Sequence, residues 1–419
     1  MIASGKTKTS GASALSLIGL NAVNFLLADA AGVVAPFLND FLREQRWRYD
    51  SIALATAIAG LGVMLAQTPA GFLVDHTRHH RGWLIAGSLV TGACLGLLPI
   101  LPAHWWIIDP LVFSSGLAGT LFPPLLAAIA LGLVGNARLN KTIGDNQAWN
   151  HAGNIAAALT AMVLVSLFSI RSVFFAITVV SVLAAMAVLL IRPEEIDGRA
   201  ASGLDGELDR PAHEVRIWSL LREHTVLVLF ASTALFHLAN APILPMVGLY
   251  IKSLHGTDKQ VAATVLTAQV VMIPVAWATG WLCDRWGRKP TMAIGFVALP
   301  VRILLYSFTR STWALVALQC FDGIGAGIYG VAIVAICADV TKGKGRFNTL
   351  MGLIATALSL GGVIGPLIGG NIVQHLGFAA AFRSFAVLAA AGAAVFLLFM
   401  PETKPLQPGT GEAAPALAQ

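Results

Sequence analysis

The sequence consists largely of apolar runs that are each long enough to cross a lipid bilayer. A helix needs about 20 apolar residues to span the hydrocarbon layer, and twelve such runs alternate with short polar stretches. Only 11% of the residues are Asp, Glu, Lys or Arg, whereas soluble chains average about 25%. The expected fold class is all-α integral membrane with 12 transmembrane helices, at residues 14–39, 52–74, 83–103, 105–134, 146–169, 172–191, 225–250, 260–282, 291–309, 312–338, 349–372 and 379–400.

The first run admits a second interpretation. Lys6 and Lys8 precede an apolar stretch that ends in Ala28-Asp29-Ala30, a pattern similar to a secretory cleavage site. Apolar character continues beyond this point through Phe37 and Leu38, which makes the run long enough to cross the bilayer. We therefore expect an uncleaved membrane helix.

The distribution of basic residues predicts the orientation of the chain. If both termini are cytoplasmic, 18 of the 27 Lys and Arg residues fall on the cytoplasmic side and 8 on the opposite side, with Arg302 inside a span. Cytoplasmic loops of membrane proteins carry such an excess of cations. We expect a multi-pass protein of the plasma (inner) membrane with both termini cytoplasmic.

The longest polar stretch divides the chain into two halves. Residues 193–223 combine acidic residues with proline and glycine, which is typical of a linker. The expected organisation is an N-terminal six-helix bundle at 1–192, a cytoplasmic linker at 193–223, a C-terminal six-helix bundle at 224–400 and a cytoplasmic tail at 401–419.

An internal repeat relates the two halves. Three matches occur in the same order, at offsets of 211, 209 and 207 residues. The repeat predicts two pseudo-symmetric six-helix bundles, related by an axis along the membrane normal. The matched segments are 25–30 with 236–241, 71–75 with 280–284, and 116–119 with 323–327.

The loop after the eighth run carries the most specific motif of the sequence. It reads G-x-L-x-D-R-x-G-R-K, and its first-half copy keeps the glycine and the aspartate before its spacing changes. With this motif and the repeat, the chain resembles the major facilitator superfamily over about residues 14–400. The resemblance implies alternating access about a central site, with both loops forming a cytoplasmic gate; the alternative is that their basic residues only anchor the topology. The gate residues are Gly71, Asp75 and Arg78 in the first copy and Gly280, Asp284, Arg285, Gly287, Arg288 and Lys289 in the second.

Three charged residues, Asp29, Arg302 and Asp322, lie inside the expected spans and away from the span ends. A charge at the centre of a membrane helix costs about 2.5–3.5 kcal/mol. Asp29 and Asp322 are placed to change protonation when a cavity opens to one side or the other, which is the physical basis of proton coupling. The alternatives are a helix-packing hydrogen bond for Asp29, a permanent ion pair with Arg302 for Asp322, and a snorkelling side chain for Arg302.

Polar side chains accompany these carboxylates on the same helix faces. One-sided polarity is typical of helices that line a translocation pathway, and packing is the alternative for the histidine of the seventh helix. The residues are Asn21 and Asn24 beside Asp29, Gln319 and Tyr329 beside Asp322, and His237 and Asn240 in the seventh helix, where Asn240 is the repeat mate of Asp29.

The fifth expected helix begins with a dense polar stripe. Asn146, Asn150 and Asn154 follow one another at intervals of four residues, with Gln147 and His151 beside them. Five hydrogen-bonding side chains on one face are costly to expose to lipid. They either line the pathway near its cytoplasmic mouth or form an interhelical network with the preceding basic loop, and part of the stripe is open to solvent in both cases.

The eleventh run contains a glycine-proline motif, from Gly361 through Gly365-Pro366 to Gly370. It is similar to the signature of drug:proton antiporters in the same superfamily, which carry it in the fifth helix. The alternative is close helix packing, which G-x-x-x-G spacing allows.

Several classes of protein are excluded by what the sequence lacks. It contains no zinc-protease, nucleophile-elbow or phosphate-loop motif, so we expect neither an enzyme nor an ATP-driven pump. The four cysteines lack metal-ligand spacing, and the net charge of +6 is not clustered on one domain. We expect no metal, cofactor or nucleic-acid partner.

The sequence therefore predicts a secondary active transporter of a small organic solute. The expected mechanism exchanges protonation of Asp29 or Asp322 against substrate, and multidrug efflux by antiport is the favoured direction. Proton-coupled or facilitated uptake of a small metabolite uses much the same parts and remains the alternative. The expected partners are the substrate, protons and the lipid bilayer, with no obligatory protein partner.

Overall fold

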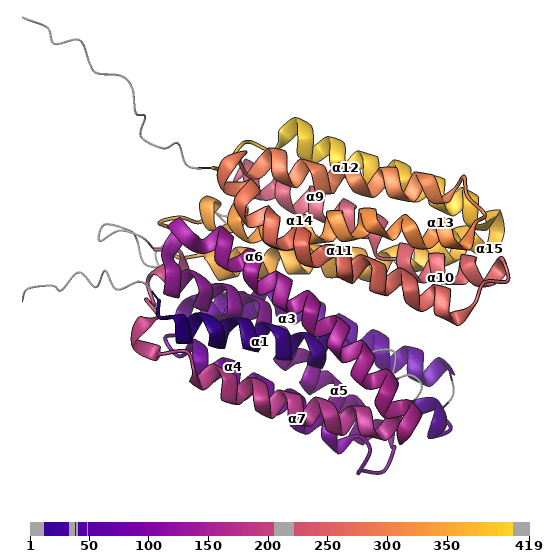
Figure 1. Cartoon of the computed structure of the whole chain (residues 1–419), viewed down its shortest axis with the longest axis horizontal. Coiled ribbons are helices and arrows are strands. Elements are labelled where there is room, and N and C mark those ends of the chain that lie inside the picture. Colours follow the sequence, from indigo (N-terminus) through magenta and orange to yellow (C-terminus); the bar gives the residue numbers. More distant parts are fainter. Residues whose placement is uncertain (1–11, 33–37, 39–40, 48, 205–221, 405–419) are drawn as a thin grey trace, which may run out of the picture.

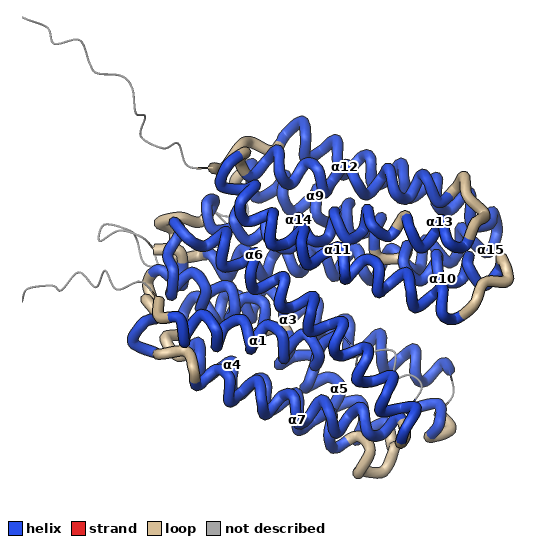
Figure 2. The backbone as a smooth tube through the Cα atoms, in the orientation of Figure 1, coloured by secondary structure: helices blue, strands red, loops and turns tan. Residues whose placement is uncertain are grey.

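The computed structural model describes residues 12–32, 38, 41–47, 49–204 and 222–404. Within these ranges the chain forms α-helices joined by short turns, with two 3-10 turns and no β-strand (Figure 2). The side chains of residues 29–32 and 49–59 lie outside the described part, although the backbone there is helical.

The helices form two groups that follow one another along the chain (Figure 1). The N-terminal group contains α1 (Ala14–Gly32), α3 (Tyr49–His76), α4 (His80–Leu97), α5 (Trp105–Gly119), α6 (Phe122–Leu167) and α7 (Ile170–Leu189). The C-terminal group contains α9 (His224–Asn240), α10 (Ile243–Ser253), α11 (Asp258–Arg285), α12 (Arg288–Tyr306), α13 (Thr312–Ala317), α14 (Gln319–Val340) and α15 (Phe347–Phe399). Between the groups lie the 3-10 turns η1 (Pro193–Glu195) and η2 (Ala200–Ser202).

The two longest helices each change direction at a single glycine. The backbone is left-handed at Gly135 in α6, with φ of 63°, and at Gly377 in α15, with φ of 81°. Glycine adopts this conformation without the steric cost of a Cβ atom. The polar stretch 136–145, expected to be a loop, therefore continues the helix, because one residue suffices for the turn.

Helices are interrupted where the sequence places proline. The seventh expected span is divided at Ala241-Pro242 into α9 and α10, and the fourth at Thr120-Leu121 into α5 and α6, just before Pro123. Proline lacks a backbone N–H and clashes with the preceding turn. By contrast, Pro274 and Pro366 lie inside continuous helices.

The exterior of the molecule is apolar, as a lipid-facing surface requires. Large hydrophobic side chains are exposed along many helices, and tryptophans are exposed near both ends of the helices, as in the aromatic belts of membrane proteins. Seven described segments are long and apolar enough to cross a membrane: Trp105–Leu167, Ile170–Leu189, His224–Ser253, Lys259–Arg285, Arg288–Tyr306, Thr312–Val340 and Phe347–Phe399.

Aromatic rings form the core of the C-terminal group. Phe296 of α12 stacks on Phe396 of α15 with ring centroids 4.5 Å apart, and it contacts Phe236 of α9 at 5.0 Å. Phe236 also stacks on Tyr329 of α14 at 5.5 Å. Four helices are thereby joined around one cluster, which fixes their relative positions.

The two groups meet at the end of the molecule that carries η1 and η2, which we call the linker end. Here α3 packs against α15 and α6 packs against α11. Toward the opposite end the ribbons of the two groups diverge (Figure 1). The contacts between the groups run from the linker end into the membrane helices, as far as Ser359 and Gln67 on one side and His151 and Gln269 on the other.

The glycine-proline motif of α15 packs closely against α9 and α10. A Cβ atom on Gly361 would lie 2.4 Å from the backbone nitrogen of Leu238, and one on Gly365 would lie 2.6 Å from the Leu238 carbonyl oxygen. The motif therefore allows close helix packing, which was one of its two expected roles.

This packing predicts that Gly361→Leu destabilises the protein, because α9 and α15 must separate to admit the side chain. Overpacking of this kind costs about 1–3 kcal/mol. We expect a lower thermal unfolding midpoint of the purified protein in detergent. Gly370→Leu, on the same helix with no atom within 4 Å of its Cβ position, is the control, and equal effects of the two substitutions would contradict this packing.

Candidate functional site

Asp75, at the end of α3, holds the beginning of α15 in the other group. Its carboxylate accepts hydrogen bonds from the backbone N–H groups of Asn348, at 2.9 Å, and Thr349, at 2.7 Å. The Asn348 amide and the Thr349 hydroxyl also donate to it, at 2.9 and 2.6 Å. The first N–H groups of a helix lack partners within the helix and favour a negative charge. The carboxylate therefore caps α15 and joins the two groups.

This carboxylate is almost fully removed from solvent. Asp75 is 6% exposed and lies one residue beyond the expected span 52–74. Burial raises the pKa of the Asp75 carboxyl to about 6, whereas the hydrogen bonds from Thr349 and Asn348 lower it. The four donors thus offset part of the loss of hydration, and burial remains the larger effect on the carboxylate.

Asp284, the repeat mate of Asp75, makes a weaker version of this contact. It lies at the end of α11, and its carboxylate accepts a hydrogen bond from the Asn140 side chain of α6. Asn140 follows Gly135 by more than four residues, so its backbone N–H belongs to the helical hydrogen-bond ladder. The second copy therefore lacks the backbone donors that the first copy has, and its carboxylate stays half exposed.

The glycines of both motif copies allow the backbones of the two groups to approach. A Cβ atom on Gly71 would lie 2.0 Å from the Asn348 carbonyl oxygen, and one on Gly280 would lie 2.5 Å from the Asn140 carbonyl oxygen. Gly352 faces the Gln67 carbonyl in the same way, at 2.4 Å. Glycine is therefore required at these positions by close packing of two helices.

The residues that receive the two aspartates were not singled out by the sequence analysis. They belong to a second repeated pattern, Arg-x-Asn-x-x-x-Gly, which occurs at residues 138–144 and 346–352, 208 residues apart. A self-comparison that included polar residues at helix starts would have found it. Each carboxylate motif thus faces a copy of the receiving motif in the opposite group.

Further hydrogen bonds extend the contact between the groups into the membrane helices. Thr68 and Thr356 hydroxyls are 2.8 Å apart between α3 and α15, and Ser359 donates to Gln67 at 3.0 Å. On the other side, a ring nitrogen of His151 in α6 lies 3.0 Å from the Gln269 side-chain oxygen in α11. His151 therefore lies at the interface between the groups, where a pathway residue was expected.

Gln147 of the same stripe also reaches the other group, since its amide donates to the Gly330 carbonyl of α14 at 3.4 Å, whereas Asn150 and Asn154 face their own group. The Asn150 amide donates to the Asn24 carbonyl of α1 at 3.4 Å, and the Asn154 amide donates to the Asn150 side chain at 3.3 Å. Asn24 in turn donates to the Leu20 carbonyl at 2.9 Å. The asparagine bonds form an interhelical network, but with α1 and not with the basic loop.

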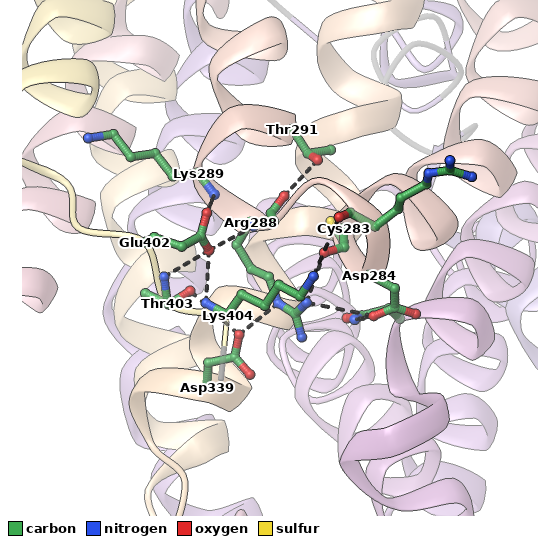
Figure 3. Close-up of polar contacts among 12 residues, drawn as sticks. Cys283, Asp284, Arg288, Lys289, Thr291, Asp339, Glu402, Thr403 and Lys404 are labelled. Carbon is green, nitrogen blue, oxygen red and sulfur yellow. Dashed lines mark hydrogen bonds and ion pairs between the residues drawn. The ribbon is translucent and has the colours of Figure 1, made fainter. Parts of the chain in front are cut away.

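Arg288 connects three segments within the C-terminal group (Figure 3). Its guanidinium donates to the Asp339 carboxylate at 2.8 Å and to the Cys283 carbonyl at 2.9 Å, and it lies 3.6 Å from Asp284. It thereby ties the end of α11 to α12 and α14. The side chain positions the loop that carries Asp284, and these three contacts all lie within the C-terminal group.

The remaining residues of the second motif lie on the same loop. The Glu402 carboxylate accepts the backbone N–H groups of Arg288, at 2.9 Å, and Lys289, at 3.1 Å, and so caps α12 (Figure 3). Arg285 lies over the Trp281 ring at 5.1 Å. Glycine at position 287 has φ of 112°, which other residues rarely adopt. In the first copy, Arg78 is exposed on the turn after α3.

A charged cluster lies within the membrane helices of the C-terminal group. The Arg302 guanidinium, 2% exposed, forms an ion pair with Asp322 and donates to the Asn240 side chain. Tyr306, one turn after Arg302, is also fully buried, and sequence analysis missed it although the i, i+4 spacing places it on the same face. The ion pair expected as one alternative for Asp322 is present.

The structure does not gather all expected pathway residues at this cluster. Tyr329 donates to the Thr233 hydroxyl at 3.3 Å and packs on Phe236, while Gln319 is fully buried without a hydrogen-bond partner. The His237 ring lies 3.8 Å from the Cβ position of Gly362 in α15. Asn21 is half-buried in α1, and the Asp29 side chain lies outside the described part of the chain.

Comparisons with known proteins agree with this arrangement. The chain matches the model of the MFS_1 like family over residues 17–384. It is 38% identical to an uncharacterised MFS-type transporter of Mycobacterium tuberculosis, over 92% of this chain and 93% of that one. It is 22% identical to the multi-drug resistance efflux pump PmrA of Streptococcus pneumoniae, over 86% and 89% of the two chains. The proton:xylose symporter XylE has a similar structure, with a TM-score of 0.71 at 14% identity, over 93% and 96% of the two chains.

An all-helical chain with lipid-facing helices and this set of relatives is a multi-pass membrane transporter. The chain belongs to the major facilitator superfamily. The resemblance drawn from the loop motif and the repeat is thereby confirmed, and members of this family are transporters and not enzymes.

The cap on α15 predicts that Asp75→Ala exposes the Asn348 and Thr349 amides. Hydrogen bonds to charged groups contribute about 1.5–3 kcal/mol, so we expect deuterium exchange in peptides covering 347–352 to accelerate about tenfold or more. Asp284→Ala is the matched control, because its partner is a side chain and those amides keep their acceptor. Unchanged exchange in Asp75→Ala would contradict the cap.

The buried ion pair predicts strong coupling between Arg302 and Asp322. Arg302→Gln or Asp322→Asn alone leaves an unpaired buried charge, which costs about 3–5 kcal/mol. In the double variant no charge remains, so we expect a loss of unfolding free energy well below the sum of the single losses. Additive losses in chemical unfolding experiments would show that the two side chains act independently.

Proposed function

We propose that this transporter is a secondary active exporter that moves a small organic solute by alternating access. The observation that carries the proposal is that two pseudo-symmetric contacts, centred on Asp75 and Asp284, join the two groups at the linker end. Such contacts are made in one state and released in the other when two bundles rock about a central site.

The proposed architecture has twelve crossing helices in two bundles of six. Trp105–Leu167 and Phe347–Phe399 each cross twice, because each turns at a glycine. The other five long segments cross once, and α1, α3 and α4 supply the remaining three crossings. The proposed boundaries are those expected from the sequence, with bundles at 1–192 and 224–400 and the linker and tail on the cytoplasmic side of the inner membrane.

The loops at the linker end are proposed to gate the cytoplasmic side. The Asp75 carboxylate must leave four donors for the bundles to separate there, and Asp284 must leave Asn140. Arg288 and Glu402 stay within their own bundle and keep the loop in shape during the movement. The described arrangement then corresponds to the state that is closed toward the cytoplasm.

Proton coupling is proposed to use the carboxylates inside the membrane helices. Asp322 pairs with Arg302 and is not fully buried, since 16% of its side chain is exposed. Protonation of Asp322 would break its ion pair with Arg302. The charge of this cluster would then differ between the two states of the transporter, and a proton gradient can drive the change from one state to the other. Asp29 is proposed as the second candidate because of its place in α1.

Export is supported by similarity to an efflux pump and by the acidic residue in the first helix. Uptake of a small metabolite is the second candidate, because the structure is also similar to that of a proton:xylose symporter. The expected partners remain the solute, protons and lipid. Neither direction requires a cofactor or a partner protein.

Proteoliposomes test the proposal directly. With ethidium as a drug-like probe and D-xylose as a sugar probe, we expect an imposed pH gradient to drive ethidium transport and ethidium to drive proton flux. Asp322→Asn or Asp29→Asn should abolish the proton flux while the protein remains inserted and folded. Unchanged coupling in both variants would refute the proton mechanism, and proton-coupled xylose entry without ethidium transport would favour uptake.

A further inference from the structure

A cavity of about 860 Å³ lies at the linker end of the N-terminal group. Its walls come from the turn between α3 and α4, from the first turn of α4, and from the linker around η1 and η2. Basic side chains dominate this lining, among them Arg78, His79, His80 and Arg81. A volume of this size is typical of small-molecule sites, so it holds much more than a water or a single ion.

The acidic residues of the lining are already engaged by the chain itself. The Asp75 carboxylate is held by Asn348 and Thr349. The Asp197 carboxylate accepts the backbone N–H groups of Arg199, at 2.8 Å, and Ala200, at 3.1 Å. Both carboxylates are thus held by donors of the chain, and the Arg81 guanidinium in turn donates to the Val188 carbonyl at 3.3 Å.

The internal repeat allows the first turn of α4 to be compared with the first turn of α12, its equivalent in the C-terminal group. In the C-terminal group, the Glu402 carboxylate caps the first turn of α12 (Figure 3). In the N-terminal group, α4 begins after His79 without a side-chain cap. Two acidic residues follow α7: Glu194, which is the sequence mate of Glu402, and Glu195, which accepts from the backbone and hydroxyl of Ser13, at 2.9 Å each. The first turn of α4 thus has no side-chain cap of the kind that its mate has.

His80 supplies an independent indication of a ligand. It is the mate of Arg288, and its ring is hydrogen-bonded to the Val74 backbone much as Arg288 is to that of Cys283. Arg288 also has Asp339 as a partner, but Leu131 stands at the corresponding position of the first half. His80 lines the cavity and is 2% exposed, and its Nε2 has no hydrogen-bond partner. A buried polar atom without a partner is costly.

We propose that this cavity binds a phosphate monoester on the first turn of α4. The N–H groups and dipole of a helix N-terminus favour phosphate oxygens, and arginine binds them with charge-assisted hydrogen bonds. The monoanion of a phosphate monoester, which coexists with the dianion around pH 6 to 7, also carries a P–OH group. It can therefore donate to a neutral His80 Nε2 or accept from a protonated one, which a simple carboxylate or halide cannot do.

Occupancy of this site would strengthen the contact at the linker end. The Ser202 hydroxyl of η2 donates to the Asp75 carbonyl at 3.2 Å, and the Asn348 amide donates to the Ala201 carbonyl at 3.0 Å. A phosphate held between the α4 turn and the linker would keep η2 against Asp75 and the start of α15. The ligand is then a regulator of gating, supplied either as a lipid headgroup or as a soluble phosphate compound.

Binding to the purified full-length protein in detergent tests this site without any transport assay, so its outcome does not depend on the proposed function. The probes are two phosphate monoesters, glycerol 3-phosphate and dioctanoyl phosphatidic acid, each titrated while thermal unfolding is followed. We expect at least one probe to raise the unfolding midpoint in a saturable way. Arg78→Gln/His79→Gln, which alters two exposed residues, should raise the half-saturating concentration at least tenfold.

Arg222→Gln removes an exposed cation outside the cavity and is the matched control, expected to bind both probes as the parent does. His80→Gln is the second variant, and it should also weaken binding. Stabilisation by glycerol 3-phosphate indicates a soluble ligand, and stabilisation by phosphatidic acid alone indicates a headgroup. The site is refuted if neither probe stabilises the parent, or if Arg78→Gln/His79→Gln binds as Arg222→Gln does.

Discussion

The interaction on which the arrangement depends is the capping of α15 by the Asp75 carboxylate. An uncapped helix start offers N–H groups that no other part of the helix can satisfy, and in this protein the acceptor comes from the opposite half of the chain. The bond is strong while the two halves touch and absent once they separate. It therefore joins the folding of one helix to the relative position of two bundles.

The two copies of the internal repeat have the same residues where helices pack against each other and different residues in the loops that follow. Glycines 71 and 280 serve the same close approach, and Asp75 and Asp284 face the same receiving pattern. The loops beyond them differ, because one half closes around Arg288, Asp339 and Glu402 and the other opens into a basic cavity. The two halves thus share one scaffold but differ in the charges of their loops at the linker end.

Much of the fold could be predicted because apolar length and repeated motifs are local properties of the sequence. The gate aspartates could be found in the same way, as could the break at Pro242. A partner such as Glu402 could not, because an isolated glutamate near a helix end has many possible donors. Asn150 and Asn154 were placed on one face correctly, but which helix covers that face depends on tertiary packing.

The measurement that most directly tests alternating movement of the two halves is electron-electron distance spectroscopy on spin-labelled protein in nanodiscs. One pair of labels at Gly82 and Lys342 would report on the linker end, and a second pair at Phe168 and Phe308 on the opposite end, all four positions being exposed. The account predicts that Asp75→Asn lengthens the first distance and shortens the second. It would be contradicted if both distances stay the same or if both lengthen together.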